Sequence, residues 1–107
     1  MAATPETADD PRVADNPAQS RYEAFLGERL AGFSEYRLRP GRIAFTHTIV
    51  EPEFEGRGIG SKLVREELED ARRRGLRVTP YCPFVRAYVR RHPEYLDLLE
   101  QHSDRST

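Results

Sequence analysis

Hydrophobic residues recur along the chain with two different spacings, and the change between them divides the sequence. In the first half, from Arg21 to Val50, they alternate with polar residues in three stretches, which predicts β-strands at 21–26, 29–38 and 42–50. Gly27-Glu28 and Pro40-Gly41 separate these stretches and are typical of tight hairpin turns. We therefore expect an antiparallel meander of three strands.

The stretch from Arg42 to Val50 has the clearest alternation. One predicted face carries Ile43, Phe45, His47 and Ile49, and the other carries Ala44, Thr46, Thr48 and Val50. Both faces are largely apolar, which is typical of a central strand that is covered on both sides.

After Gly58 the spacing becomes helical. Apolar residues on one face and charged residues elsewhere predict a helix over 58–74, and Gly75 is a suitable C-cap. A short buried strand is expected at 76–81, and a right-handed crossover would place it parallel to the strand at 42–50. Proline residues then begin two further predicted helices, from Pro83 and from Pro93 to about Gln101. The predicted order is β-β-β-α-β-α-α, an α/β fold with a mixed sheet.

The two ends of the chain lack this patterning. Residues 1–18 are rich in Ala, Pro, Asp, Glu and Thr and have almost no large apolar side chains, so we expect a disordered leader. Residues 103–107 are expected to form a frayed tail. A single domain is predicted over 19–102, because 107 residues suffice for one modest core.

Composition narrows the possible partners and the compartment. The formal net charge is -1, which argues against a general nucleic-acid-binding protein. No apolar run is long enough to span a membrane. Because Cys82 is the single cysteine, no internal disulfide can form, and the reducing cytoplasm is the expected compartment.

A glycine-rich segment joins the third predicted strand to the first predicted helix. It consists of Gly56, Arg57, Gly58, Ile59, Gly60, Ser61 and Lys62. Closely spaced glycines and a helix N-terminus together can bind a phosphate or pyrophosphate. The positive charges of Arg57 and Lys62 would favour an anion at this place. The alternative is a simple turn with two solvated cations. A Walker loop is excluded because no Gly-Lys-Ser or Gly-Lys-Thr is present, and Ser61 does not fit a dinucleotide fingerprint.

Four motifs in order resemble a known family. They are His47-Thr48, Glu55-Gly56-Arg57-Gly58-Ile59-Gly60-Ser61, Cys82-Pro83-Phe84-Val85 and Arg91-His92-Pro93-Glu94-Tyr95. Together with the predicted element order they resemble the GNAT acetyltransferase superfamily, and more closely its short stand-alone YjdJ-type N-acetyltransferase domains. The resemblance covers roughly Tyr22 to Leu99. It implies a compact GNAT-like fold, that of the acyl-CoA N-acyltransferases.

The resemblance also implies a reaction, the transfer of an acetyl group from acetyl-CoA to a primary amine. Backbone N–H groups of Gly56 to Ser61 would hold the pyrophosphate, with Arg57 and Lys62 adding positive charge. A backbone N–H near Ile49 or Val50 would polarise the thioester carbonyl. Glu55 stands where the wider superfamily usually has Arg or Gln, so we expect this carboxylate to face solvent or pair with an arginine.

Three side chains are candidates for catalysis. Cys82 is expected near the thioester, either as a carrier of the acetyl group or an acid beside the coenzyme sulfur, or alternatively as a small buried hydrophobic residue. Tyr88 would protonate the leaving thiolate or would simply pack in the core. His47 would accept a proton from the amine or would be a hydrogen-bonded core histidine. Cys82, His47 and His92 lack metal-site spacing, so we predict no metal.

Two other kinds of function fit the same sequence. One is a non-catalytic module that binds acetyl-CoA or CoA as a sensor or partner subunit, because the chain is short on the side where superfamily members bind the acceptor. The other is an interaction domain that binds no cofactor. The sequence indicates neither the acceptor amine nor a protein partner nor the oligomeric state.

Overall fold

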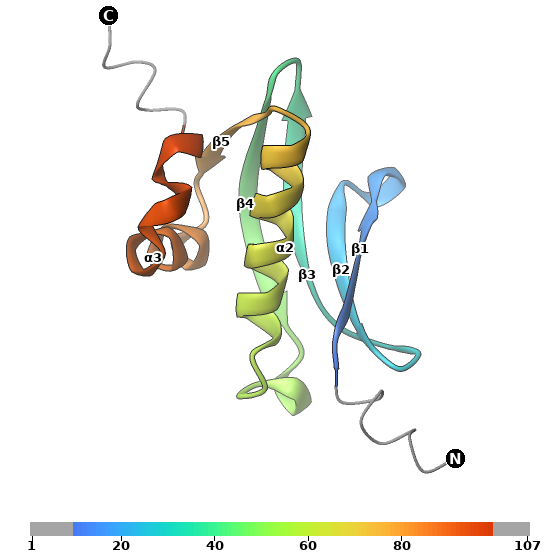
Figure 1. Ribbon diagram of the computed structural model, residues 1–107. Helices are drawn as coiled ribbons and strands as arrows, with labels where there is room; N and C mark the ends of the chain where they lie inside the picture. Colours follow the sequence, from blue (N-terminus) through green and yellow to red (C-terminus); the bar gives the residue numbers. More distant parts are fainter. Residues whose placement is uncertain (1–9, 100–107) are drawn as a thin grey trace, which may run out of the picture.

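The computed structural model describes residues 10–99, which form one five-stranded sheet and two α-helices (Figure 1). The strands lie in the sheet in chain order, and they are β1 (Arg12–Asn16), β2 (Arg21–Leu26), β3 (Arg29–Arg39), β4 (Arg42–Val50) and β5 (Arg77–Pro80). The first four strands pair antiparallel, and β5 pairs parallel with β4. The predicted mixed sheet and the predicted parallel crossover are confirmed.

The helices follow the predicted order. They are α2 (Ile59–Arg73) and α3 (Pro83–Arg91), and the 3-10 helices are η1 (Pro17–Gln19), η2 (Pro52–Phe54) and η3 (Pro93–Leu98). The helix predicted to run from Pro93 to about Gln101 is thus a 3-10 helix that ends at Leu98. Residues 100 and 101 lie outside the described residues.

Strand β1 corrects the predicted leader over residues 1–18. Residues 12–16 pair with β2 along their whole length, and the hydroxyl of Tyr36 donates a hydrogen bond of 2.7 Å to Asp15 Oδ1. An edge strand derives its stability from the ladder and its neighbours, so the low hydrophobicity of this segment was a poor guide. Residues 1–9, the domain end at 102 and the predicted tail at 103–107 lie outside the described residues.

A β-bulge in β4 changes which side chains face the core. Glu35 pairs with His47 while its neighbour Tyr36 pairs with Phe45, so Thr46 is an extra residue on β4. Ile43 and Phe45, on one side of the bulge, are buried, whereas His47 and Ile49, on the other side, are exposed. The prediction that all four residues share one face is wrong, because one extra residue reverses the alternation.

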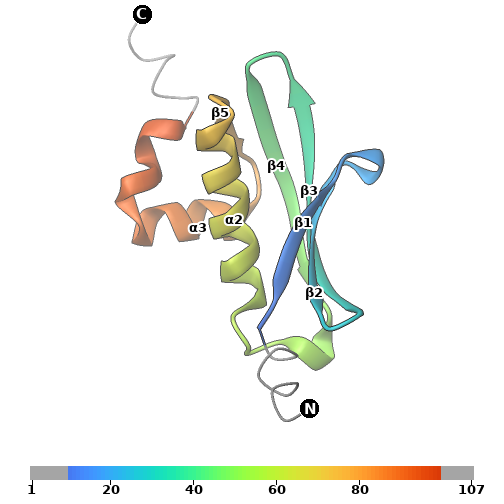
Figure 2. The same cartoon turned by 45° about the vertical axis from the view of Figure 1, so that its right-hand side comes forward.

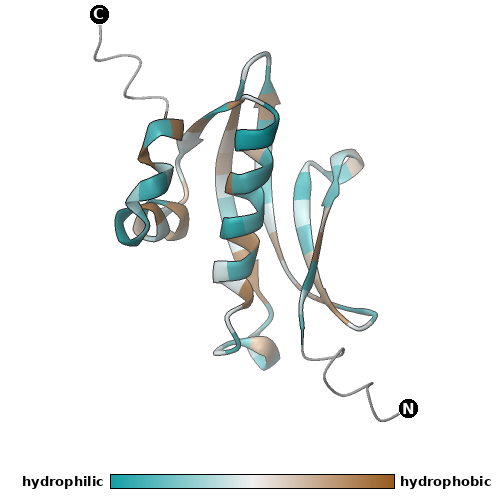
Figure 3. Cartoon of the chain, in the orientation of Figure 1, coloured by the Kyte–Doolittle hydropathy of each residue, from teal (hydrophilic) through white to brown (hydrophobic). Residues whose placement is uncertain are grey.

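The core lies between α2 and one face of the sheet. Buried residues of α2 such as Leu63, Val64 and Leu68 contact the sheet, while charged residues cover the opposite side of this helix (Figure 3). Figures 1 and 2 show α3 beside α2 near the edge strand β5, so both helices lie on the same side of the sheet. Ile49 on the other face is 44% exposed, and the prediction that β4 is covered on both sides is wrong.

None of the helices in the described part of the chain is both long and apolar enough to cross a membrane.

Two glycines lie at close contacts, and alanine there would have different effects. A Cβ atom on Gly32 of β3 would lie 2.7 Å from the carbonyl oxygen of Ile49 and 3.3 Å from the Cα atom of Val50. A Cβ atom on Gly60 of α2 would lie 2.6 Å from the tip of the Phe84 ring. Backbone atoms of a central strand cannot move aside, whereas the partly exposed Phe84 ring can rotate outward.

We therefore predict that Gly32→Ala lowers the free energy of unfolding by about 1–3 kcal/mol, the usual cost of overpacking. Gly60→Ala should cost much less, since alanine gains up to about 1 kcal/mol over glycine inside a helix. Urea unfolding of the two variants and the wild type measures this difference. Equal losses in the two variants would contradict the distinction between backbone and side-chain contact.

Candidate active site

The central feature of the site is a gap between β4 and β5. The parallel pairing ends at Phe45 and Pro80, and one more hydrogen bond of 3.0 Å follows, from the N–H of Cys82 to the carbonyl of Phe45. Beyond the bulge at Thr46, β4 runs on to Val50 while the chain after β5 turns into α3. The two strands therefore separate at the bulge, where the side chains of β4 exchange faces of the sheet. The second half of β4 consequently has an edge that is not paired with β5.

The alternation of the backbone along β4 indicates which of its N–H and C=O groups face this gap. The N–H of Glu51 donates to the carbonyl of Ala31 on β3, at 2.8 Å. Successive residues of a strand direct their N–H and C=O groups to opposite edges, so Ile49 faces β3 whereas Thr48 and Val50 face the gap. Of the two residues predicted to polarise a carbonyl, Val50 thus has its backbone N–H on the appropriate edge.

The glycine-rich segment lies immediately after β4 and leads into α2. Gly56 and Gly58 have φ angles of +83° and +78°, a conformation that other residues adopt rarely, and a Cβ atom on either glycine would meet no other group within 4 Å. Gly58 precedes the first residue of α2 and supplies no side-chain cap, and the first turn contains no acidic residue. This helix start is consequently open and suited to an anion.

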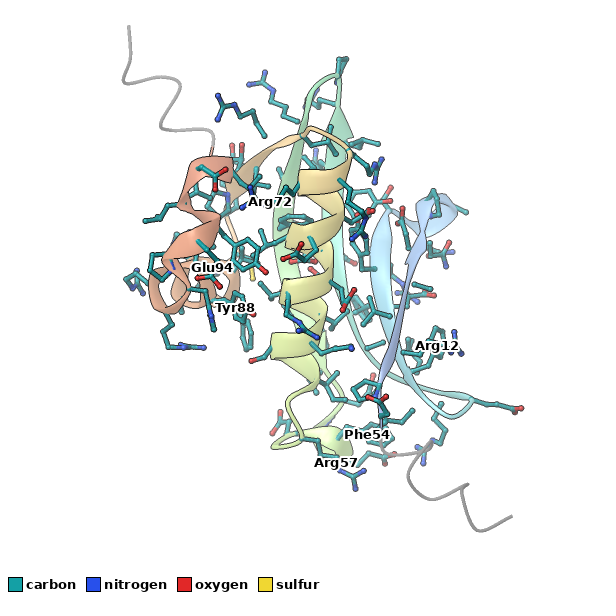
Figure 4. The ribbon with its side chains drawn as sticks, viewed as in Figure 1. Arg12, Phe54, Arg57, Arg72, Tyr88 and Glu94 are labelled. Carbon is teal, nitrogen blue, oxygen red and sulfur yellow. The ribbon has the colours of Figure 1, made fainter. Side chains whose placement is uncertain are left out.

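Other residues predicted for the anion site have partners in the protein. Arg57 lies over the Phe54 ring, 5.6 Å from its centroid, at the open loop (Figure 4). Lys62 forms an ion pair of 3.6 Å with Glu66 one turn along α2. Gly60 and Ile59 are buried, and Gly60 makes room for Phe84. The positions best placed for a ligand are thus Gly56 to Gly58, with half-buried Ser61 in the first helical turn.

The carboxylate of Glu55 is exposed, in agreement with the expectation that it faces solvent.

Cys82 lies on the helix side of the gap, at the N-cap of α3. It is only 3% exposed, and its Sγ atom lies 3.3 Å from the Thr48 hydroxyl oxygen on the second half of β4. The bulge makes this contact possible because it turns Thr48 toward the helices. The structure therefore brings Cys82 to the edge of β4 beyond which the two strands separate.

A buried carboxyl group, missed by the sequence analysis, lies in the same part of the core. Glu67 of α2 is fully buried, and within the described chain neither of its carboxyl oxygens has a hydrogen-bond partner, nor has the hydroxyl of Ser34. Burial raises the pKa of Glu67 well above its usual value. The nearby Cys82 raises this pKa further, and the nearby Ser34 hydroxyl lowers it only in part. Ser34 is the cross-strand partner of Thr48, which contacts Cys82.

A signal for Glu67 was present in the sequence. It falls between Leu63, Val64 and Leu68, on the apolar side of a helix whose other acidic residues fall elsewhere. A carboxyl group in such a position is costly unless it is neutral or paired, and such costs are often retained at functional sites.

The other two candidate catalytic residues have surroundings different from those of Cys82. His47 is exposed on the helix-free face, with Nδ1 3.6 Å from Glu35 Oε1, so the alternative of a core histidine is wrong. Tyr88 of α3 is buried, which raises its pKa, and its ring stacks on His92 with centroids 4.1 Å apart. Tyr88 and Glu94 lie beside α2 (Figure 4), and the Tyr88 ring also contacts the ring of Tyr95.

Comparison with known proteins agrees with this geometry. The family model described as GCN5-related N-acetyl-transferase matches residues 21–98. The chain belongs to the GCN5-related N-acetyltransferase family. The match begins at β2 and ends with η3, and thus includes the glycine-rich segment, the gap and Cys82.

A solved structure with the same fold supports the architecture. The NMR solution structure of a GCN5-like protein from Staphylococcus aureus is 22% identical in sequence, with a TM-score of 0.63 over 82% of this chain and 86% of that one. A search of curated proteins gives no significant match.

Burial of Glu67 leads to a prediction about the pH dependence of stability. The pKa of glutamic acid in an unfolded chain is about 4.3. Below that pH, Glu67 is protonated in both the native and the unfolded state, and its ionisation does not affect the free energy of unfolding. Above it the unfolded chain ionises while the native state retains the proton, so stability falls as the pH rises, by up to about 1.4 kcal/mol per pH unit. The fall should stop once the pH exceeds the raised native pKa.

Replacing Glu67 should remove this contribution. In urea unfolding between pH 5 and pH 8, Glu67→Gln should lose less stability with rising pH than the wild type does. Glu66→Gln, on the half-exposed side of the same helix, is the matched control and should retain the wild-type slope. If Glu67→Gln and the wild type have parallel pH profiles, the native pKa of Glu67 is not raised.

Proposed function

We propose that this protein transfers an acetyl group from acetyl-CoA to a primary amine. The observation that carries the proposal is the arrangement along β4, in a chain of the GCN5-related family. One strand has a bulge, an edge left unpaired by β5, and the glycine-rich helix start at its end. A phosphate site and a thioester site would thus lie along a single rigid element.

Binding of the coenzyme would begin at the glycine-rich segment. Backbone N–H groups between Gly56 and Ser61, together with the dipole of the 15-residue α2, favour a pyrophosphate. Arg57, which is exposed beside the loop, would add charge. The pantetheine arm would extend along the unpaired edge of β4, where the N–H of Val50 is suited to hydrogen bond the thioester carbonyl.

The reaction has a simple balance of atoms and charges. The neutral amine nitrogen attacks the thioester carbonyl, a C–N bond forms and the C–S bond to CoA breaks. The electron pair leaves with sulfur, which must be protonated, while the nitrogen must lose a proton. An amine that arrives as its ammonium form gives up one further proton to solvent.

Two side chains would serve these proton transfers from opposite faces of the sheet. His47 on the helix-free face would take the proton from the amine, with Glu35 beside it to stabilise the imidazolium. Cys82 on the helix face, with Thr48 as its hydrogen-bond partner, would act as an acid at the coenzyme sulfur. As a transient acetyl carrier its sulfur would instead attack the thioester, so that an S–acetyl bond forms while the C–S bond to CoA breaks; the amine would then attack this acetyl group and the Cys82 sulfur would leave and regain a proton. Because the Tyr88 ring stacks on His92, we rank Tyr88 after Cys82 as the acid that protonates the leaving thiolate.

The phosphate site can be tested with two nearly isosteric variants. Asn and Asp both tolerate a positive φ and differ mainly in charge, so Gly58→Asn and Gly58→Asp should fold equally well. In calorimetric titration with acetyl-CoA, the aspartate variant should bind about tenfold or more weakly than the asparagine variant, because its carboxylate would repel the pyrophosphate. Equal affinities of the two variants would contradict a phosphate at this helix start.

The non-catalytic alternative makes a different prediction for the same protein. A sensor or partner subunit would bind acetyl-CoA with this charge dependence but release no CoA with any amine. The reactivity of the loaded protein therefore separates the two functions.

The role of Cys82 as a carrier is tested by intact-mass analysis. After incubation with acetyl-CoA and no amine, the wild type should gain one acetyl group that hydroxylamine removes, and Cys82→Ala should gain none. Thr48→Val retains the thiol but loses its hydroxyl partner, so it should acetylate more slowly. Full transferase activity in Cys82→Ala would exclude both the carrier and the acid role.

A further inference from the structure

The helix-free face of the sheet carries two neighbouring hollows that share lining residues, here together named the sheet-face groove. Both hollows are lined by Arg37 and Thr46. The larger, of about 420 Å³, extends to Arg39 and Arg42, near the β3–β4 turn. The smaller, of about 320 Å³, extends to Glu35 and His47.

The two ends of the sheet-face groove have opposite charge character. None of the described residues that line the larger hollow is acidic, and Arg37 and Arg39 have no carboxylate partner within the described chain. Some arginines elsewhere on the surface do have such partners, as in the pairs Arg21–Glu23, Arg29–Glu53 and Arg72–Asp97. At the other end, Glu35 lies beside His47 and makes that end favourable for a cation.

From this pattern we infer that the sheet-face groove binds the acceptor as a zwitterion, a primary amine that carries an anionic group a few carbon atoms away. The amine would lie at Glu35 and His47, and the anion would lie at Arg37 and Arg39. Guanidinium groups match carboxylates and phosphates equally well, so the shared chemistry is an anionic group of either kind. This inference rests on the proposed function, since it names the acceptor of the same site.

The position of the sheet-face groove fits this role. Thr46, which lines both hollows, is the bulge residue that directly follows the last β4 residue paired with β5. An amine in the groove would therefore approach the gap from the face opposite to Cys82. Arg37 pairs with Ala44, three residues before His47, a spacing of about 10 Å along the strand. Because the Arg37 side chain can extend toward His47, the distance between its guanidinium group and the amine site would be that of a short alkyl chain.

The arginines of the groove are too far away to serve the coenzyme phosphates. Arg39 and Arg42 flank the β3–β4 turn at one end of β4 and Arg37 pairs with Ala44, whereas the glycine-rich segment follows the other end of β4. The six steps from Ala44, the partner of Arg37, to Val50 correspond to about 20 Å, and the eight steps from Arg42 correspond to about 26 Å. A negative charge at Arg37 and Arg39 thus requires a second anion, distinct from the pyrophosphate.

A matched series of amines tests the inferred specificity. Pentylamine, pentane-1,5-diamine, 5-aminopentanoate and 4-aminobutylphosphonate have similar lengths and differ in the far group. With acetyl-CoA, CoA release should be fastest at low concentration for the two anionic amines, and the faster of these identifies the anion as carboxylate or phosphate-like. The variant Arg37→Ala/Arg39→Ala should raise the KM for the anionic amines about tenfold or more and change that for pentylamine little.

A binding measurement tests the groove without turnover. The inert zwitterion 5-(trimethylammonio)pentanoate cannot be acetylated, and in NMR titration of the acetyl-CoA-loaded protein it should shift the amide signals of Arg37 and His47. Arg37→Ala/Arg39→Ala should weaken this binding about tenfold. The variant Arg90→Ala/Arg91→Ala removes the same charge from the exposed side of α3, outside the groove, and should bind the probe like the wild type.

Each result has one meaning. Equal loss of binding in the two double variants, or no shift at Arg37 and His47, would overturn the zwitterion groove. A preference for pentylamine or the diamine would overturn it as well. Specific binding of the zwitterion by a protein that acetylates no amine of the series would overturn the proposed function and leave the assignment of the groove in place.

Discussion

Strand β4 pairs with β3 along its whole length but with β5 only from Arg42 to Phe45. The bulge at Thr46 occurs where that second pairing ends, and it has two consequences. It turns Thr48 toward the helices, where this residue meets Cys82, and it turns His47 to the open face. One inserted residue thus places Thr48 beside the Cys82 thiol and the His47 imidazole on the opposite face of the sheet.

The elements around this gap differ in how strongly they are held. Gly32 of β3 lies against the backbone of Ile49 and Val50, so β3 and β4 are in close contact directly behind the gap. On the helix side the packing includes a buried carboxyl group, Glu67, without a hydrogen-bond partner among the described residues. A hydrocarbon side chain there would avoid this cost, and stability is commonly lost in this way where a site needs a polar group.

Sequence patterning predicted the meander from β2 to β4, the crossover helix and the parallel strand, because turn residues such as Pro40 and Gly41 and the helical spacing of Leu63 and Leu68 act locally. It missed β1, whose stability depends on pairing with β2 and not on its own composition. It also placed His47 on the same face as the core residues of β4, because a bulge leaves no mark in a hydrophobic pattern. Membership of the family was recognisable from motifs, and the fold agreed with it.

The candidate site was predictable only in part. The glycine-rich segment and Cys82 are marked by residue type, whereas their exposure and partners are tertiary properties. Gly60 illustrates the limit, since it belongs to the glycine motif yet makes room for Phe84 of α3. The sheet-face groove combines residues of β3 and β4 with Thr79 of β5 and Tyr81 after it, so no single stretch of the sequence could indicate it.

The shortness of β5 has a consequence for association between chains. As an outer strand it could in principle recruit a strand from another molecule, which is a common route to aggregation. Its free edge is limited, because it has only four residues, ends in Pro80, which has no N–H group, and is bridged at Val78 by Leu99. The same strand whose early end opens the gap thereby offers little edge for intermolecular β-sheet formation.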